Sequence, residues 1–452
     1  MKKRILALLF VILALALCAC SNNEISTDTS SSTDTSSSTD TASDTEIIEE
    51  IKSLVELTVD KNESFVGKIS FNIKSDGVFG EYSLEFADKN GETLPHYSKI
   101  SNGSLTKEKS TIEIEGLVLP SACEKLALSI NEEKYSLEIP NEYLVGVDTY
   151  RFGALSDVHY NKGNYFNLAL DFLDKAGIDF VGVCGDLSNE GELESLQKFN
   201  EAIKERKYKV YTVSGNHDIP ALDNGSWKEN INTSIINDNE VVEIAENGID
   251  FVYKPKAMGG AFVFLSQTRW NYPSIVDPSE YTLLDKEQLD WLRAILEKNK
   301  EEPVFLFFHT LLADTNGLSA EAVGNLKNPG GYEYPLDYTY GAADEVEFRA
   351  LMNEYKNVVF FSGHSHWMFE MEAFNKNVNF SNFGGEYCHM VHIPSVCEPR
   401  WIGVYDEKRT SKTGEASEGW IVDVSSEAII FTPVDFIKEI YYTEYMEIIP
   451  LQ

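Results

Sequence analysis

The chain has 452 residues and is poor in positive charge. It carries 38 lysine and arginine residues against 73 aspartate and glutamate residues, which gives a formal net charge of -35. A negative surface repels DNA, RNA and anionic membranes, so a nonspecific binder of nucleic acid polymers is not expected. The charge does not exclude a small phosphorylated substrate, because a bound metal ion can reverse the local field.

Cysteine is scarce as well, and its spacing excludes one class of metal site. The six cysteines include no CxxC pair, which argues against a thiolate zinc site. Cys388 and Cys397 could form a disulfide in an oxidising exterior, or remain thiols, and the sequence leaves both outcomes open. Cys184 lies inside an apolar run and is expected to be a small buried side chain.

The chain lacks an apolar run long enough to span a membrane near its N-terminus. Residues 2–4 are basic and residues 5–19 are apolar, a run shorter than the ~20 residues of a membrane-spanning helix. We therefore predict a signal peptide over residues 1–20. Its last four residues, Leu17-Cys18-Ala19-Cys20, resemble a bacterial lipobox, in which Cys20 becomes lipidated after cleavage. Lipidation at Cys18 and a plain secretory signal are the alternatives.

The segment that follows lacks apolar residues almost entirely. Up to Thr45 it consists mainly of Ser, Thr, Asp, Asn and Ala, a composition that cannot bury enough apolar surface to fold. We predict that residues 21–52 form a disordered tether. With a lipidated Cys20, the tether would hold the protein at the extracellular face of a bacterial membrane; without the lipid, the protein would be secreted.

Residues 53–145 show the pattern of a small all-β module. Apolar and polar residues alternate in Lys68–Ile73 and Tyr82–Phe86, and turn-forming residues such as Ser75-Asp76-Gly77 separate these runs. The alternation continues at Thr111–Glu115 and Tyr135–Ile139. Short strands at this spacing predict a β-sandwich-like module.

Over residues 147–452 the pattern changes to apolar strands that alternate with helices. The expected strands are 151–155, 180–184, 208–213, 304–308, 358–361, 420–424 and 428–431. Helices are expected at 165–176, where Gly177 ends the helix, at 193–203, and after a capping box formed by Asp285 and Gln288. Uninterrupted apolar strands alternating with helices predict an α/β domain with buried sheets.

Asp, Asn and His side chains follow five of these strands. The residues are Asp157 and His159; Asp186; Asn216, His217 and Asp218; His309; and His364 and His366. Ligands of α/β folds bind at the carboxyl ends of strands. Imidazoles and carboxylates suit divalent ions such as Mn, Fe and Zn. The sequence therefore predicts a metal site where these strands end.

The order of these motifs resembles the calcineurin-like metallophosphoesterase superfamily. The series Asp-x-His, Gly-Asp, Gly-Asn-His-Asp, His and Gly-His-x-His occurs in this order between about residues 150 and 370. The resemblance implies a four-layer αββα sandwich and two divalent metal ions. It implies that Asp186 bridges the ions, that Asp157, His159 and His366 complete one site, and that Asn216, His309 and His364 complete the other.

The resemblance also implies a reaction, the hydrolysis of phosphodiester or nucleotide-type esters by a metal-bridging hydroxide. His217 would protonate the leaving oxygen or stabilise its charge, and Asp218 would orient the His217 imidazole. Asn216 and His217 would also contact the substrate. A strict phosphomonoesterase and a surface binding protein that acts through the β-module are the alternative functions.

Two positions depart from the patterns of particular relatives. Purple acid phosphatases carry a tyrosine ligand where this chain has Asn189, so a tyrosinate–iron site is not expected. Many phosphodiesterase-like members have a second histidine after the lone one, where this chain has Thr310. This difference weakens the assignment of a diester substrate.

Residues outside the signature are candidates for substrate contact. Tyr332 and Tyr334 belong to a tyrosine cluster after His309, and they could stack on a nucleobase or pack the loop. Arg400 is a further candidate. His389 and His392 lie outside the signature and are interpreted as structural, although one of them could line the pocket.

Overall fold

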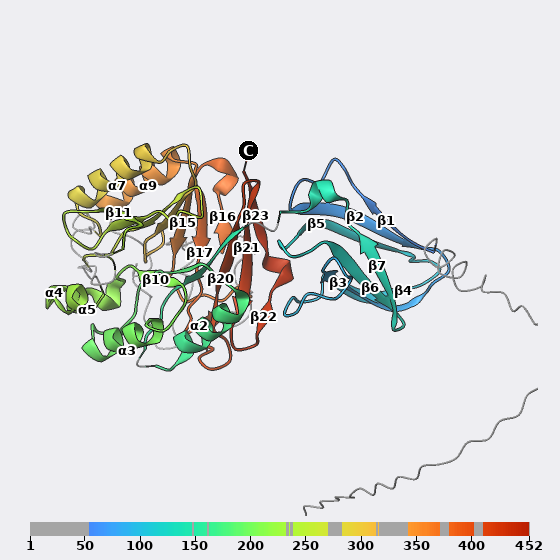
Figure 1. Cartoon of the computed structure of the whole chain (residues 1–452), viewed down its shortest axis with the longest axis horizontal. Helices are drawn as coiled ribbons and strands as arrows, with labels where there is room; N and C mark the ends of the chain where they lie inside the picture. Colours follow the sequence, from blue (N-terminus) through green and yellow to red (C-terminus); the bar gives the residue numbers. More distant parts are fainter. Residues whose placement is uncertain are drawn as a thin grey trace, which may run out of the picture. The chain divides into compact units, whose positions relative to one another are not determined.

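Two seven-stranded sheets lie at the centre of residues 150–451 in the computed structural model (Figure 1). The structure describes residues 54–146, 149–160, 162–231, 235, 238–269, 283–312, 315, 342–370, 379–401 and 410–451. The predicted signal peptide, its Cys20 and the predicted tether lie outside these residues. No helix within the described ranges is long and apolar enough to cross a membrane.

The first sheet has the order β10-β9-β8-β20-β21-β22, and β23 also pairs with β21. Strands β8, β9 and β10 are parallel to one another, whereas β20 is antiparallel to β8. The bounds are β8 Tyr150–Leu155, β9 Phe180–Val183, β10 Lys209–Thr212, β20 Glu418–Val424, β21 Ala428–Asp435, β22 Ile440–Tyr441 and β23 Glu447–Pro450.

The second sheet has the order β11-β12-β13-β14-β15-β17-β16. Its four central strands, β13, β14, β15 and β17, are parallel. The bounds are β11 Val241–Ile244, β12 Phe251–Tyr253, β13 Ala261–Phe264, β14 Val304–Phe307, β15 Val358–Ser362, β16 Phe380–Ser381 and β17 His389–His392.

Aromatic side chains fill the space between the two sheets. Phe152 of the first sheet meets Phe262 and Phe305 of the second edge to face, with ring centroids 4.9 and 5.1 Å apart. These side chains are fully buried, and such edge-to-face pairs are favourable beyond the area that they bury. The uninterrupted apolar strands of the sequence therefore reflect sheets that are covered on both faces.

Helices cover the outer face of each sheet. Helices α2 (Tyr165–Ala176) and α3 (Leu193–Ile203) pack on the first sheet, and α7 (Lys286–Lys298) and α9 (Ala342–Glu354) pack on the second (Figure 1). As predicted, α2 ends at Gly177 in the left-handed conformation, and Asp285 forms a capping box with Gln288 at the start of α7. The four-layer αββα arrangement is confirmed.

The N-terminal part of the described chain is β-rich, as the alternation predicted. One sheet has the order β1-β2-β5 and the other the order β4-β3-β6-β7, all antiparallel. The bounds are β1 Val55–Val59, β2 Lys68–Ser75, β3 Gly80–Ala87, β4 Ser101–Leu105, β5 Thr111–Val118, β6 Lys125–Ile130 and β7 Glu133–Glu138. Their apolar residues form a common core, as in a β-sandwich.

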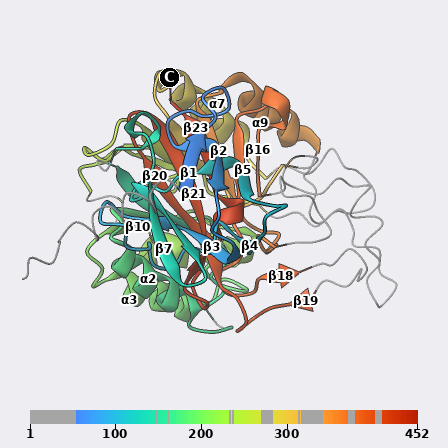
Figure 2. The ribbon, with the colours of Figure 1, turned by 90° about the vertical axis from the view of Figure 1, so that its right-hand side faces the viewer.

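Shorter elements complete the description. The two-stranded sheet of β18 (Arg400–Trp401) and β19 (Thr410–Ser411) lies apart from the large sheets (Figure 2). Helices α4 (Ile219–Asp223) and α5 (Ser226–Asn230) follow β10. The four cysteines of the described residues are buried and free, so Cys388 and Cys397 form no disulfide in this structure.

Candidate metal centre

The loops after β8 and β9 lie side by side because these strands are parallel neighbours. The amide of Asp157 donates to the Gly185 carbonyl at 3.1 Å, and the amide of His159 donates to the Asp186 carbonyl at 2.9 Å. The backbone bonds continue the ladder beyond the strands and bring the Asp157 and Asp186 carboxylates to the same edge of the first sheet.

The second sheet brings its histidines to the same place. The amide of Gly363 donates to the His309 carbonyl at 2.8 Å, so the loops after β14 and β15 are also joined. The amide of His364 donates to Asp157 Oδ2 at 3.0 Å, which links the loops of the two sheets. The predicted ligands therefore meet where the carboxyl ends of both sheets converge.

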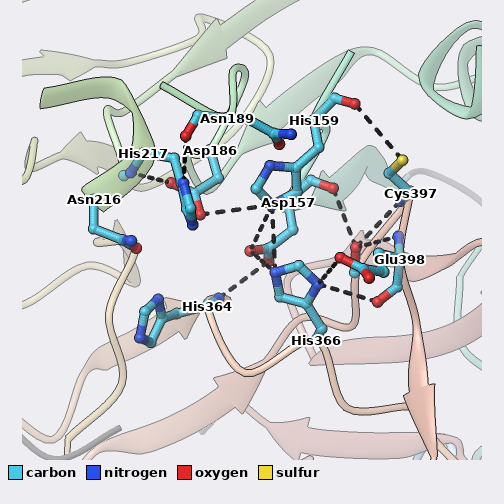
Figure 3. A network of polar contacts seen from close by, with 12 residues as sticks. Asp157, His159, Asp186, Asn189, Asn216, His217, His364, His366, Cys397 and Glu398 are labelled. Atoms are coloured by element: carbon cyan, nitrogen blue, oxygen red, sulfur yellow. Dashed lines mark hydrogen bonds and ion pairs between the residues drawn. The ribbon is translucent and has the colours of Figure 1, made fainter. Parts of the chain in front are cut away.

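The ligand atoms form two groups that share Asp186. Asp157, His159, Asp186 and His366 form one group, and Asp186, His309 and His364 form the other; within each group the atoms lie within 4.8 Å of one another. Asn216 adds its Oδ1 atom, which lies 3.2 Å from His309 Nε2. The structure thus brings together all seven predicted ligands, six of which are labelled in Figure 3.

Backbone carbonyls orient three of the imidazoles. The Nδ1 atoms of His159, His309 and His366 lie 3.1, 2.6 and 3.0 Å from the carbonyl oxygens of Ser188, Cys184 and Glu398. A carbonyl only accepts, so each Nδ1 carries a hydrogen and donates it. Each Nε2 atom then faces the carboxylates, which is the orientation of metal-ligating histidines.

Two carboxylate oxygens in the centre have no hydrogen-bond partner although they are buried. Asp157 Oδ1 lies 3.0 Å from His366 Nε2, and Asp186 Oδ2 lies 3.2 Å from His309 Nε2 and 3.7 Å from His159 Nε2. Carboxylate oxygens and imidazole nitrogens that face one another in a buried site require positive charge between them, supplied by protons or by cations. Divalent metal ions fit this donor set and supply that charge.

The pKa values of the centre show the same demand for positive charge. Burial raises the pKa of Asp157 and Asp186, but the surrounding imidazoles outweigh burial and hold both values well below the usual range. Burial lowers the pKa of His309, but Asp186 outweighs it and raises the value to about 9. Burial dominates at His159 and lowers its pKa to about 4. The carboxylates thus stay charged, and the site favours cations.

The backbone of the ligand loops is strained. Asp157, His159, Asp186, His364 and His366 have φ angles between 39° and 68° and account for five of the ten non-glycine residues with positive φ in the described chain. Such conformations are costly for residues with a Cβ atom and cluster at functional sites.

Glycines allow the loops to approach one another closely. A Cβ atom on Gly215 would overlap the Asp186 carboxylate, and one on Gly363 would overlap the Ser156 hydroxyl. Gly363 itself has no positive φ; the left-handed residues are His364 and His366. Its role is therefore close packing, whereas the turn is made by the ligands themselves.

His217 lies beside the centre, on the 3-10 helix η2 (Asn216–Asp218). Its amide donates to Asp186 Oδ1 at 3.0 Å, and its ring centroid lies 5.2 Å from that of His159. Its Nδ1 atom lies 2.5 Å from the Asn189 carbonyl oxygen (Figure 3), so Nδ1 is the protonated donor. The His217 side chain is exposed, and its Nε2 atom takes no part in this hydrogen bond.

The predicted role of Asp218 is wrong. Its carboxylate does not orient the His217 imidazole but accepts hydrogen bonds from the amides of Leu187, Ser188 and Gly215 and from the Ser188 hydroxyl. Burial, with Asp186 nearby, raises the pKa of Asp218 to about 6. Asp218 therefore ties the loop after β9 to the loop after β10, and the Asn189 carbonyl takes the place expected for it.

The remaining candidates have different outcomes. Arg400 lies near the centre, where its amide donates to the His366 carbonyl at 2.7 Å and its guanidinium pairs with Glu398 at 3.0 Å. Tyr332 and Tyr334 lie outside the described residues. His392 is fully buried; its Nε2 lies 2.5 Å from the Ser365 hydroxyl and its Nδ1 lies 2.9 Å from Asn379 Oδ1. It therefore supports the loop that carries His364 and His366.

Sequence reasoning missed the segment from Ser395 to Glu398, which contacts the ligand loops. Three of its contributions are backbone groups, the Val396 and Cys397 amides and the Glu398 carbonyl, which almost any residue type supplies, and no motif marked the segment. The sequence signal was its place after Met390–Ile393, which is apolar apart from His392 and where a further strand end was to be expected.

The comparison with protein families decides the assignment. Residues 150–368 match the family model of the calcineurin-like phosphoesterases. This part of the chain is a calcineurin-like phosphoesterase. The resemblance read from the five motifs is thus confirmed.

Solved structures that are similar to this chain include the following three. The purple acid phosphatase PPD1 from yellow lupin (Lupinus luteus) seeds is 15% identical, with 88% of this chain and 74% of that chain covered and a TM-score of 0.39. The phosphopantetheinyl hydrolase PptH from Mycobacterium tuberculosis is 15% identical (54% and 89% covered, TM-score 0.31). A predicted phosphoesterase from Streptococcus pneumoniae TIGR4 is 10% identical (67% and 98% covered, TM-score 0.28). No curated protein matches the chain in sequence.

The calcineurin-like phosphoesterase family gives the centre its chemistry. Its members are metal-dependent hydrolases of phosphate esters, and the buried groups of Asp and His fit such metals. The phosphoesterase is therefore an enzyme that acts on phosphorylated substrates.

Proposed function

We propose that the phosphoesterase hydrolyses phosphodiester or nucleotide-type esters of small molecules and that it uses two divalent ions, with Mn, Fe and Zn as the best candidates. The observation that carries the proposal is the pair of ligand groups that share Asp186. Asp157, His159 and His366 would complete one metal position, and Asn216, His309 and His364 the other. When bound, the two ions would supply an activated water and neutralise phosphate charge.

The protein's own residues have distinct tasks in this proposal. Asp186 would serve both positions, since its Oδ2 atom lies near imidazoles of each group. His217, whose Nδ1 hydrogen is held by the Asn189 carbonyl, would present Nε2 to the leaving oxygen and hold or donate a proton there. Asn216 and His217 would contact the phosphate, and Arg400 is a more distant candidate for substrate contact.

The experiment compares two nitrophenyl esters. The purified protein is stripped of metal, and Mn, Zn, Fe, Co or Mg is restored before it is assayed with bis-p-nitrophenyl phosphate and with p-nitrophenyl phosphate. We expect metal-dependent turnover with a preference for the diester. Turnover of the monoester alone would establish the phosphomonoesterase instead. Two bound ions without turnover of either ester would contradict the proposed activity.

We propose further that Cys20 carries a lipid and that residues 21–52 tether the domains to the extracellular face of a bacterial membrane, with the β-module at 53–145 and the phosphoesterase domain at 147–452. The support is the order of basic residues, apolar run and cysteine in the sequence. Cys20→Ser should release the protein from the membrane fraction, and Cys18→Ser is the matched control. Release by Cys18→Ser alone would move the anchor to Cys18, and membrane association of both variants would refute the lipid anchor.

A further inference from the structure

We call the segment Ser395-Val396-Cys397-Glu398 the brace. It contacts the metal centre but lies outside the part of the chain that matches the family model, because that match ends at residue 368. The brace follows β17, and Ser395, Val396 and Cys397 are fully buried. It is therefore packed in the core beside the centre.

The brace holds the loop that carries Asp157. The Ser395 hydroxyl donates to the Asp157 carbonyl at 3.1 Å, and the Cys397 amide donates to the same oxygen at 3.3 Å. The Val396 amide donates to the Ser156 carbonyl at 3.0 Å. These bonds fix the backbone at a ligand that has a positive φ angle.

The brace also contacts His159 and His366 of the same group (Figure 3). The Cys397 thiol lies 3.7 Å from the His159 carbonyl oxygen, and the Glu398 carbonyl accepts the His366 Nδ1 hydrogen at 3.0 Å. The Glu398 carboxylate pairs with Lys162 at 2.5 Å and with Arg400 at 3.0 Å, which fixes the end of the brace.

The other group of ligands has different supports. The Cys184 carbonyl accepts from His309 Nδ1, and η2 carries Asn216. Within the described ranges, no hydrogen bond of the brace reaches Asn216 or His309. The brace therefore serves one ligand group and not both.

We propose that the brace is a positioning element that sets the affinity for the metal ion held by Asp157, His159 and His366 and leaves the affinity for the other ion unchanged. This inference rests on the proposed two-ion function. The physical reason is that groups bonded to metal ligands fix the orientation of the ligands, and that the loss of one such partner weakens metal binding by ~10–100-fold.

Ser395 is the best position for a test because its hydroxyl shapes the whole brace. Its Oγ atom donates to Asp157 and accepts the amides of Cys397 at 3.2 Å and Glu398 at 2.8 Å. Ser395→Ala removes all three bonds with the loss of one atom. Ser417→Ala is the matched control, because Ser417 is equally buried but its Oγ atom has no hydrogen-bond partner.

The measurement is a chelator titration of the full chain loaded with Zn, in which the ions that remain per chain are counted by mass spectrometry. For Ser395→Ala we expect one ion to leave at a chelator concentration ~10–100-fold below that for the wild type, while the second ion leaves as in the wild type. Ser417→Ala should match the wild type. Parallel loss of both ions, or no change in either, would overturn the proposal.

Cys397 provides a second test that does not depend on the folding of the Ser395 variant. Cys397→Ala removes the donor to His159, whereas Cys397→Ser keeps a donor. We expect early loss of one ion in the first variant and recovery in the second. If the two variants released their ions at the same chelator concentrations, the proposed role of the Cys397 thiol in metal affinity would be contradicted.

The wild-type control separates the two proposals. Two bound ions without ester hydrolysis would contradict the proposed function while the brace could still be confirmed by selective release. Fewer than two ions in the wild type would overturn both proposals.

Discussion

The two ligand groups of the centre differ in where their support comes from. His309 is oriented by a carbonyl at the end of β9, within the part of the chain that matches the family. Asp157, His159 and His366 also contact the brace, which lies beyond that part, although the carbonyl of Ser188 that orients the His159 ring lies within it. The comparison teaches that a family signature can contain every ligand of a metal site and omit the residues that hold them in place.

Asp186→Ala should have the largest effect, because it removes the one residue that both groups share. We expect both ions to be lost and hydrolysis to fall by at least ~10³-fold, which corresponds to ~4 kcal/mol of activation free energy. Metal analysis and ester assays provide the measurements, and Asp171→Ala on the exposed side of α2 is the control. If Asp186→Ala retained two ions, Asp186 would not be a ligand that the two groups share.

His217→Ala should leave both ions in place, because His217 belongs to neither group. We expect turnover of esters with poor leaving groups to fall by ~10²-fold, in the range of general acid catalysis. Turnover of nitrophenyl esters should fall much less, because nitrophenolate needs little protonation. An equal loss for both kinds of ester would indicate that His217 binds phosphate and does not protonate the leaving group.

His392→Gln should weaken both metal positions equally, in contrast to Ser395→Ala. Its partner Ser365 lies between His364 and His366, which belong to different groups. We expect a loss of metal affinity of ~10-fold for each ion. His389→Gln on the same strand is the control, since the ring of His389 packs against that of Phe380. If His392→Gln lost only one ion early, Ser365 would support the ligand of one group and not those of both.

Glu418→Gln should have the smallest effect and should alter stability, not metal binding. Burial raises the pKa of Glu418 to about 8, above its value in the unfolded chain. The folded wild type therefore keeps a proton that the unfolded chain releases, and its stability should fall as the pH rises from about 4.5 to about 8.

The Gln variant should lose this pH dependence and should unfold at a temperature a few degrees above that of the wild type at pH 9. Thermal unfolding at pH 5, 7 and 9 measures the effect, with the exposed Glu427→Gln as the control. The Glu418 amide donates to the Ser395 carbonyl. If Glu418→Gln also changed the chelator concentration at which an ion leaves, β20 would contribute to positioning the metal ligands together with the brace. An unchanged slope of stability against pH would contradict the buried neutral carboxyl.

The sequence predicted the strands that are long and apolar and the ligands that follow them. It also located α2 and α7 through Gly177 and the Asp285 capping box. Strands β11 to β13 were not predicted, because they are only three or four residues long and lack a functional motif. Short apolar runs of this kind do not distinguish a strand from other buried segments.

The side chains that form the candidate site were predicted from the sequence, but the groups that hold them in place were not. The supports were missed because the groups that orient His159, His309 and His366 are main-chain carbonyls, which every residue type has. The same cause explains the error at Asp218, where backbone amides of Leu187, Ser188 and Gly215 bind the carboxylate. A carboxylate next to a histidine in sequence does not show which donors it meets in space.

The orientation of imidazoles by main-chain carbonyls has a consequence for the divergence of this protein. A carbonyl keeps its position when the side chain beside it is replaced, provided that the backbone path is unchanged. Mutations that change the side chain at positions 184, 188 or 398 therefore need not change the orientation of the histidine rings. A centre built in this way can drift far in sequence around a small set of fixed ligands.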